Sequence, residues 1–183
     1  MDGTATITES NVTLDQVSLT MKSLIGYTTA PHNVLKQSTP VVEELLRSDL
    51  AQTLATALDK AAIQGSGVSS EPTGVANQTG VGSVLHPNGG DPSWSNVVDL
   101  ELAIDVDNAA TENMAQLTTP TMFATLKKTE RATGTASFIV EGNPTGKRSR
   151  MNGYGIQSTL NCPSGTVILG DWSQLLIDMW GGL

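Results

Sequence analysis

Hydrophobic residues follow two different periods along the chain, and the period predicts which segments form strands and which form helices. In residues 4–29 apolar and polar residues alternate, as they do in a strand. The apolar positions include Val12, Leu14, Val17, Leu19 and Met21. Because Thr and Ser fill most of the other positions, the segment offers few apolar side chains for burial. We therefore predict an extended β arm or hairpin here, not a central core strand.

The strongest helical pattern runs from Pro40 to Gln64 without an internal Gly or Pro. Thr39 suits the N-cap and Pro40 suits the first helical position. Apolar residues recur on one face of this segment: Val42, Leu46, Leu50, Leu54, Ala57, Leu58 and Ala61. We predict a helix about 37 Å long, with an apolar stripe that packs against an equally long partner. A charge in that seam, as in Leu54→Asp, is expected to cost several kcal/mol.

Glycines then crowd the stretch AAIQGSGVSSEPTGVANQTG, residues 61–80. Gly65 is placed where a helix C-cap glycine is expected. Phosphate-binding glycine loops come before a helix, whose N-terminus offers free N–H groups, whereas these glycines follow one. We interpret residues 65–95 as a long loop that joins two lobes, and we expect limited proteolysis to cut it.

The second half of the chain alternates between helical and strand patterns. We predict a helix over 95–108, a short strand in MAQLTTP ending at Thr119, and a helix over 120–130. Residues 133–150 are polar and predict a mobile loop. Short strands close the chain at YGIQST, TVILGD and QLLIDMW, around turns at Pro163-Ser164-Gly165 and Gly170-Asp171.

Composition narrows the class of protein. The chain has 183 residues, enough for one or two domains, and a net charge of −8. This negative net charge argues against a protein that binds nucleic acid through its phosphates. We interpret the basic cluster Lys147, Arg148 and Arg150 as a solvated patch. The single cysteine, Cys162, excludes an intramolecular disulfide. No apolar run predicts a membrane span and the acidic, polar N-terminal residues do not read as a signal peptide, so a cytoplasmic origin is expected.

Catalytic patterns are scarce. His32 and His86 lie in different predicted loops and make no metal-binding spacing with Cys162. The run Gly142–Lys147 departs from a phosphate-binding loop in its glycine spacing and in Arg148, which stands where Ser or Thr binds magnesium. Four carboxylates near predicted element ends are read as solvated or turn residues: Asp105, Asp107, Asp171 and Asp178. We therefore expect no catalytic, cofactor-binding or metal-binding residues and no enzymatic activity.

The order of these motifs resembles the major capsid proteins of tailed bacteriophages, which have the Hong Kong 97-like fold. The similarity runs from about residue 12 to residue 183 and depends on the order and spacing of several short matches. Pro40–Gln64 resembles the spine helix, Gly65-Ser66-Gly67 the turn after it, and Glu71-Pro72-Thr73-Gly74 the EPTG loop. The other matches are Thr119-Pro120 before a helix, Gly153-Tyr154-Gly155-Ile156 and Gly170-Asp171.

The resemblance implies an α+β capsid fold with a long spine helix, an extended β arm and an axial lobe of mixed sheet plus helices. Residues 1–64 would form part of the arm and the peripheral domain, 65–94 the connection, and 95–183 a C-terminally truncated axial domain. A full family member would carry further segments at both ends, so the chain resembles an internal or truncated piece from a phage or prophage. The segments that carry covalent cross-links in some members are unmatched.

The implied function is that of a structural subunit of an icosahedral capsid that encloses packaged DNA. Its partners would be other copies of itself, in hexamers and pentamers of the intact protein, with scaffold, protease and portal proteins of the phage. The truncated chain alone is expected not to assemble, because its arms are shortened. It would reside in the virion, and in the host bacterial cytoplasm before assembly. Two alternatives stay open: an encapsulin-type shell subunit, and a small ligand-binding or enzymatic domain.

Overall fold

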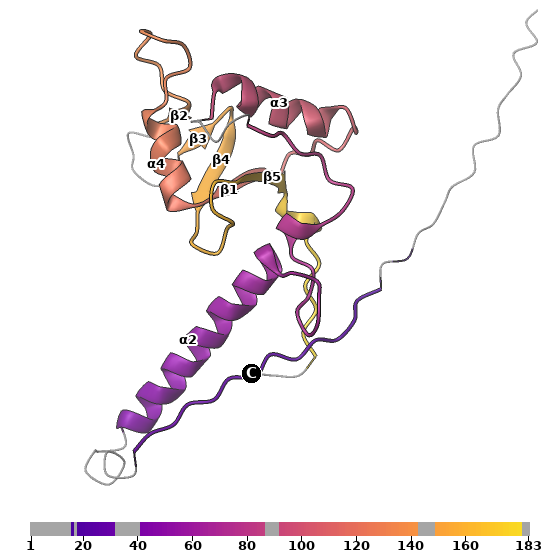
Figure 1. The fold of residues 1–183 in the computed structure, drawn as a ribbon, viewed down its shortest axis with the longest axis vertical. Helices are drawn as coiled ribbons and strands as arrows, with labels where there is room; N and C mark the ends of the chain where they lie inside the picture. Colours follow the sequence, from indigo (N-terminus) through magenta and orange to yellow (C-terminus); the bar gives the residue numbers. More distant parts are fainter. Residues whose placement is uncertain (1–15, 17, 32–40, 87–91, 143–148, 181–183) are drawn as a thin grey trace, which may run out of the picture.

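The computed structural model describes residue 16 and residues 18–31, 41–86, 92–142 and 149–180. These residues form two halves (Figure 1). One half, the spine half, holds helix α2 (Val41–Gln64), the extended segment before it and the loop after it, which includes the short helix η1 (Val75–Asn77). The other half, the sheet half, holds helices α3 (Trp94–Asp105) and α4 (Pro120–Lys128), a five-stranded sheet and the short helix η3 (Trp172–Gln174).

The predicted long helix is confirmed over its described length. Helix α2 runs unbroken for 24 residues, with Glu43 and Glu44 in its first turn, where negative charge is favourable. Its predicted cap, Thr39, and Pro40 lie outside the described residues. The Glu43–Arg47 ion pair, 2.8 Å long, is solvent-exposed and therefore contributes little to stability.

Residues 18–31 form an extended arm outside the core, as predicted (Figure 1), but they belong to no strand, so the predicted β pairing is wrong for the part that is described. The segment lies along α2 instead of pairing with a strand (Figure 1). A Cβ atom at Gly26 would lie 3.0 Å from Leu54 and 3.1 Å from Leu50. Because a single extended segment covers it, the α2 stripe is half-buried. The expected cost of Leu54→Asp falls accordingly to about 1 kcal/mol.

The glycine stretch closes the end of α2 tightly. Gly65 donates to Ala61 O over 3.0 Å, and Gly74 donates to Gly65 O over 2.9 Å. Asn77 Nδ2 also donates to Gly65 O, over 2.8 Å. Gly65 is at the predicted position, but its φ is not left-handed. Close backbone packing requires glycine there instead, because a Cβ would overlap the carbonyl oxygens of Ala61 and Pro72.

The sheet has the strand order β2-β3-β4-β1-β5. Its strands are β1 (Met114–Thr118), β2 (Val140–Glu141), β3 (Arg150–Met151), β4 (Tyr154–Ser158) and β5 (Val167–Asp171). Strand β1 pairs in parallel with β4 and antiparallel with β5, so the sheet is mixed, as predicted. Helices α3 and α4 start near their predicted positions, capped by the side chains of Ser93 and Thr119.

The core lies between one face of the sheet and the two helices. Its buried members are Val97, Leu126, Ile139, Val140, Met151 and Ile156. Val97 comes from α3 and Leu126 from α4, so both helices cover the same face. Leu117, on the opposite face of β1, lies in a groove with Ala62 and Ile63 at the end of α2.

Three predictions for the second half are wrong in detail. Residues 133–150 are not all loop, because Ile139 and Val140 enter the core and β2 pairs with β3. Gly170 and Asp171 belong to β5 and pair with β1, so they form no turn. Residues 174–180 form no strand, since the described structure offers them no pairing partner. The turn at Gly165 is confirmed, with φ +75°.

Candidate functional surface

Among the described residues, the side chains with candidate chemistry are not gathered into a reactive cluster. Cys162 is buried, its Sγ lies 3.4 Å from Thr166 Oγ1, and burial raises the pKa of its thiol. His86 is half-buried in the loop before α3, while His32 and residues 143–147 lie outside the described part. Within the described residues, no group of three or more His, Cys, Asp or Glu side chains could hold a metal ion.

Asp171 has a structural role at the end of β5. Its carboxylate accepts hydrogen bonds from Ser173 N over 2.9 Å and from Thr111 Oγ1 over 2.7 Å. Hydrogen bonds from Ser173 and Thr111 hold the pKa of Asp171 below its usual value. The carboxylate thus starts η3 and ties it to the segment before β1. Of the other carboxylates considered, Asp105 ends α3, while Asp107 and Asp178 are exposed in loops.

A polar cluster that sequence reasoning missed joins α3 to the β3–β4 turn. Glu101 accepts hydrogen bonds from Tyr154 Oη, over 2.8 Å, and from Asn152 Nδ2. The hydrogen bond to Glu101 raises the pKa of Tyr154. Asn152 and Gly153 both have positive φ, as a tight hairpin turn requires. The Asn-Gly pair predicts the turn, but no sequence pattern predicts that Glu101 accepts hydrogen bonds from both sides of it.

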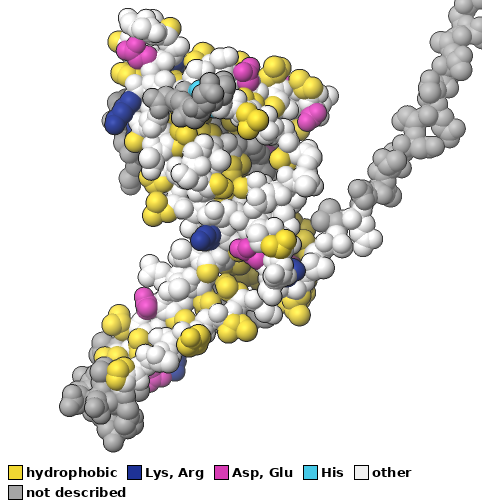
Figure 2. Space-filling model, viewed as in Figure 1, with side chains coloured by type: hydrophobic (Ala, Val, Ile, Leu, Met, Phe, Trp, Pro, Cys, Tyr) yellow, Lys and Arg dark blue, Asp and Glu magenta, His cyan; other side chains and the backbone are white. Residues whose placement is uncertain are grey.

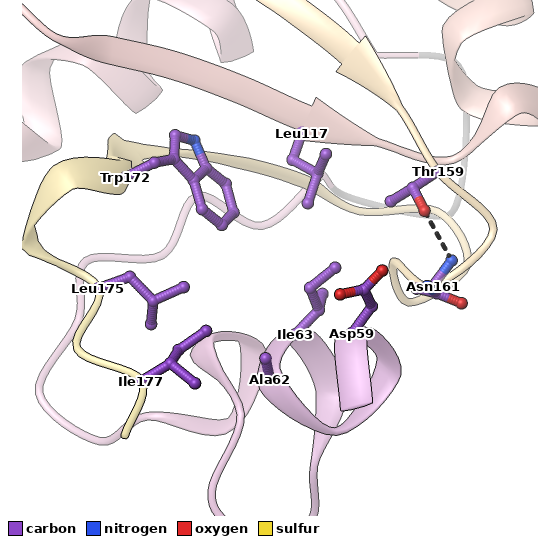
Figure 3. Close-up of a pocket in the computed structure, with 9 residues that line it drawn as sticks. All are labelled: Asp59, Ala62, Ile63, Leu117, Thr159, Asn161, Trp172, Leu175 and Ile177. Atoms are coloured by element: carbon purple, nitrogen blue, oxygen red, sulfur yellow. Dashed lines mark hydrogen bonds between the residues drawn. The ribbon is translucent and has the colours of Figure 1, made fainter. Parts of the chain in front are cut away.

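A groove of about 290 Å³ separates the end of α2 from the sheet. Figure 3 shows Ala62 and Ile63 facing Leu117 and Trp172 across it, with Leu175 and Ile177 at the side. Asp59, Thr159 and Asn161 supply its polar edge. Trp172 Nε1 already donates to Ala115 O over 2.9 Å, and Thr159 Oγ1 accepts from Asn161 N over 3.2 Å. The groove therefore offers apolar packing surface and lacks converging catalytic groups.

Large apolar side chains are exposed on two segments that flank α2. In the segment before α2, Ile25 and Tyr27 are 85% and 87% exposed. Exposed apolar residues also fill the end of the described chain: Leu175, Leu176, Ile177, Met179 and Trp180. In Figure 2 yellow side chains gather over the lower half of the molecule. Concentrations of exposed apolar residues are typical of protein–protein contact surfaces. No helix in the described ranges is both long and apolar enough to cross a membrane.

Two comparisons with known proteins give matches. The model of the Phage capsid family matches residues 1–183. The chain is 27% identical over 173 residues to the major capsid protein of Halomonas phage phiHAP-1. This alignment covers 94% of the chain but only 27% of the Halomonas phage protein. The chain thus spans about a quarter of the length of the curated relative it matches.

Proposed function

The chain belongs to the phage capsid family, and we propose that it acts as a structural subunit of a bacteriophage or prophage capsid. The family match over the whole chain is the observation that carries this proposal. The spine half also supports this proposal. Its exposed apolar side chains would be buried only by contact with another protein surface, and that burial is favourable. A subunit that repeats the same contact many times can use modest interfaces of this kind.

The finer description extends this proposal. We assign the chain a Hong Kong 97-like fold, in which residues 1–64 belong to the peripheral domain, 65–94 to the connection and 95–183 to the axial domain. Copies of the intact protein, of which this chain is a part, assemble as hexamers and pentamers of an icosahedral shell around packaged DNA. Scaffold, protease and portal proteins of the phage assist this assembly. It takes place in the host cytoplasm and yields the virion.

Isolation of particles tests this function. The gene product is expressed in bacteria, particles are separated by gradient sedimentation, and their shells are examined by electron microscopy and peptide mass spectrometry. We expect closed shells that contain peptides of this chain and no associated enzyme cargo. Shells that enclose a cargo enzyme would indicate an encapsulin-type container. A soluble monomer that binds a small molecule would contradict the shell function altogether.

A further inference from the structure

Charged residues of the sheet half are separated by sign along the chain. Residues 92–126 contain five acidic side chains and no Lys or Arg: Asp99, Glu101, Asp105, Asp107 and Glu112. Residues 127–150 contain six basic and two acidic side chains. The first segment includes α3 and the second begins with the last two residues of α4, so Asp99 and Asp105 lie on or beside one helix and Lys127 and Lys128 on another.

Helix α3 carries an apolar stripe that nothing in the described structure covers. Val98, Leu102 and Val106 are spaced four residues apart and therefore lie on one face, 41%, 55% and 74% exposed. Asp99 and Asp105, both exposed, lie on opposite sides of the stripe because of their helical spacing. In Figure 2 yellow and magenta side chains gather over this part of the molecule. The α3 patch, defined by these five residues, is apolar in the middle and acidic at its edges.

The end of α4 carries the complementary chemistry. Lys127 Nζ lies 4.2 Å from the centre of the Phe123 ring, and Lys128 beside it is exposed. Phe138, 44% exposed, pairs with Glu130 just beyond the helix. The α4 patch, defined by Phe123, Lys127, Lys128 and Phe138, therefore combines positive charge with the exposed Phe138 side chain and the part of Phe123 that is not packed on the core.

The two patches do not neutralise each other within one subunit. The ion pairs in the described part of the chain are Glu43–Arg47 and Arg131–Glu141, and neither joins α3 to α4. Figure 1 shows α4 at one side of the sheet half, while α3 extends toward the other side. Two different, complementary patches on one chain make a head-to-tail contact, which closes into a ring when the rotation between copies permits it.

From this arrangement we propose that the α3 patch of one copy docks on the α4 patch of the next copy. The inference rests on the proposed capsid function and names the surface through which neighbouring sheet halves meet. Val98, Leu102 and Val106 pack on the two aromatic rings. Asp99 and Asp105 face Lys127 and Lys128 across the contact.

Charge reversal tests this contact. One variant carries Asp99→Lys and Asp105→Lys, and the other carries Lys127→Glu and Lys128→Glu. Self-association of the full chain is measured by sedimentation velocity at low and high salt, and circular dichroism verifies folding. Each variant alone is expected to associate at least about tenfold more weakly than wild type, because like charges then face each other. Their equimolar mixture is expected to recover association, since every contact then joins opposite charges.

A control variant with Glu44→Lys and Asp49→Lys places the same increase of four charges as the α3 variant on α2 instead, and is expected to weaken association less than the α3 variant does. If wild-type chains associate and neither charge reversal weakens them, the α3–α4 contact is wrong while the capsid function stands. If both variants weaken but their mixture does not recover, the patches do not face each other and the contact is again wrong. Wild-type chains that stay monomeric throughout would overturn this contact, and particle isolation would then decide the capsid function separately.

Discussion

The two halves of the molecule bury their apolar residues to very different degrees. The sheet half has its own core, in which Leu126 and Ile139 are fully buried and Met151 is 1% exposed. In the described part of the spine half, only the glycines Gly65 and Gly74 are buried. The sheet half can therefore hold its fold by itself, whereas the spine half leaves hydrophobic stabilisation to be gained from contacts with other chains.

A Leu→Ala substitution in each half should show this difference in burial most strongly. Leu126→Ala removes a fully buried side chain, and we expect it to lower the free energy of unfolding by about 2–5 kcal/mol. Leu54→Ala removes a half-buried side chain from α2, and we expect a loss of about 1 kcal/mol. Urea unfolding followed by circular dichroism measures both. Equal losses at the two positions would contradict the contrast between the halves.

A smaller effect is expected where the spine half is packed tightly. Gly74→Ala places a Cβ that would overlap the backbone nitrogens of Gln64 and Gly65, and we expect a loss of about 1–3 kcal/mol. Gly170→Ala is the matched control, because a Cβ there meets nothing within 4 Å and φ is not left-handed. Thermal unfolding compares the two. If Gly74→Ala unfolds like Gly170→Ala, the loop does not press against the end of α2.

The contrast between the halves also explains which elements could be predicted. Helix α2 has local signals over 24 residues, including a regular stripe and no internal Gly or Pro, so its extent follows from the sequence. The caps of α3 and α4 are equally local. Strand pairing is not local: Val140 becomes a core residue only because Met151 lies opposite it. The alternation in residues 18–29 does not lead to a strand for the same reason, since no strand among the described residues pairs with it.

Some features of the candidate surface follow from local sequence, and others depend on how the elements pack. The expectation of no catalytic residues depends on residue types and their spacing in the sequence, and it stays a prediction. The exposure of Val98, Leu102 and Val106 could not be predicted, because their spacing is also that of a helix packed on a sheet. Only the position of Val97 in the core shows which face of α3 is turned inward.

The smallest predicted effect concerns two carboxylates, the half-buried Asp171 in the sheet half and the exposed Glu71 in the spine half. Hydrogen bonds from Ser173 and Thr111 lower the pKa of Asp171, and hydrogen bonds from Ser66 lower the pKa of Glu71. A carboxyl group with a lowered folded-state pKa stabilises the fold above its unfolded pKa. This contribution is lost as pH falls through the folded value. We therefore expect stability to decline below about pH 4, the ordinary range of these groups.

Asp171→Asn and Glu71→Gln separate the two contributions when melting temperature is measured between about pH 6 and about pH 2. Asp171 joins η3 to the segment before β1, so Asp171→Asn should lower the melting temperature at neutral pH. The melting temperature of this variant should also decline less in acid than that of wild type. Glu71 holds only the turn after α2, through Ser66, so Glu71→Gln should change the main transition less. Parallel acid profiles for wild type and Asp171→Asn would show that the carboxylate contributes nothing to the fold. A larger effect at Glu71 would mean that the spine half, and not the sheet half, limits stability.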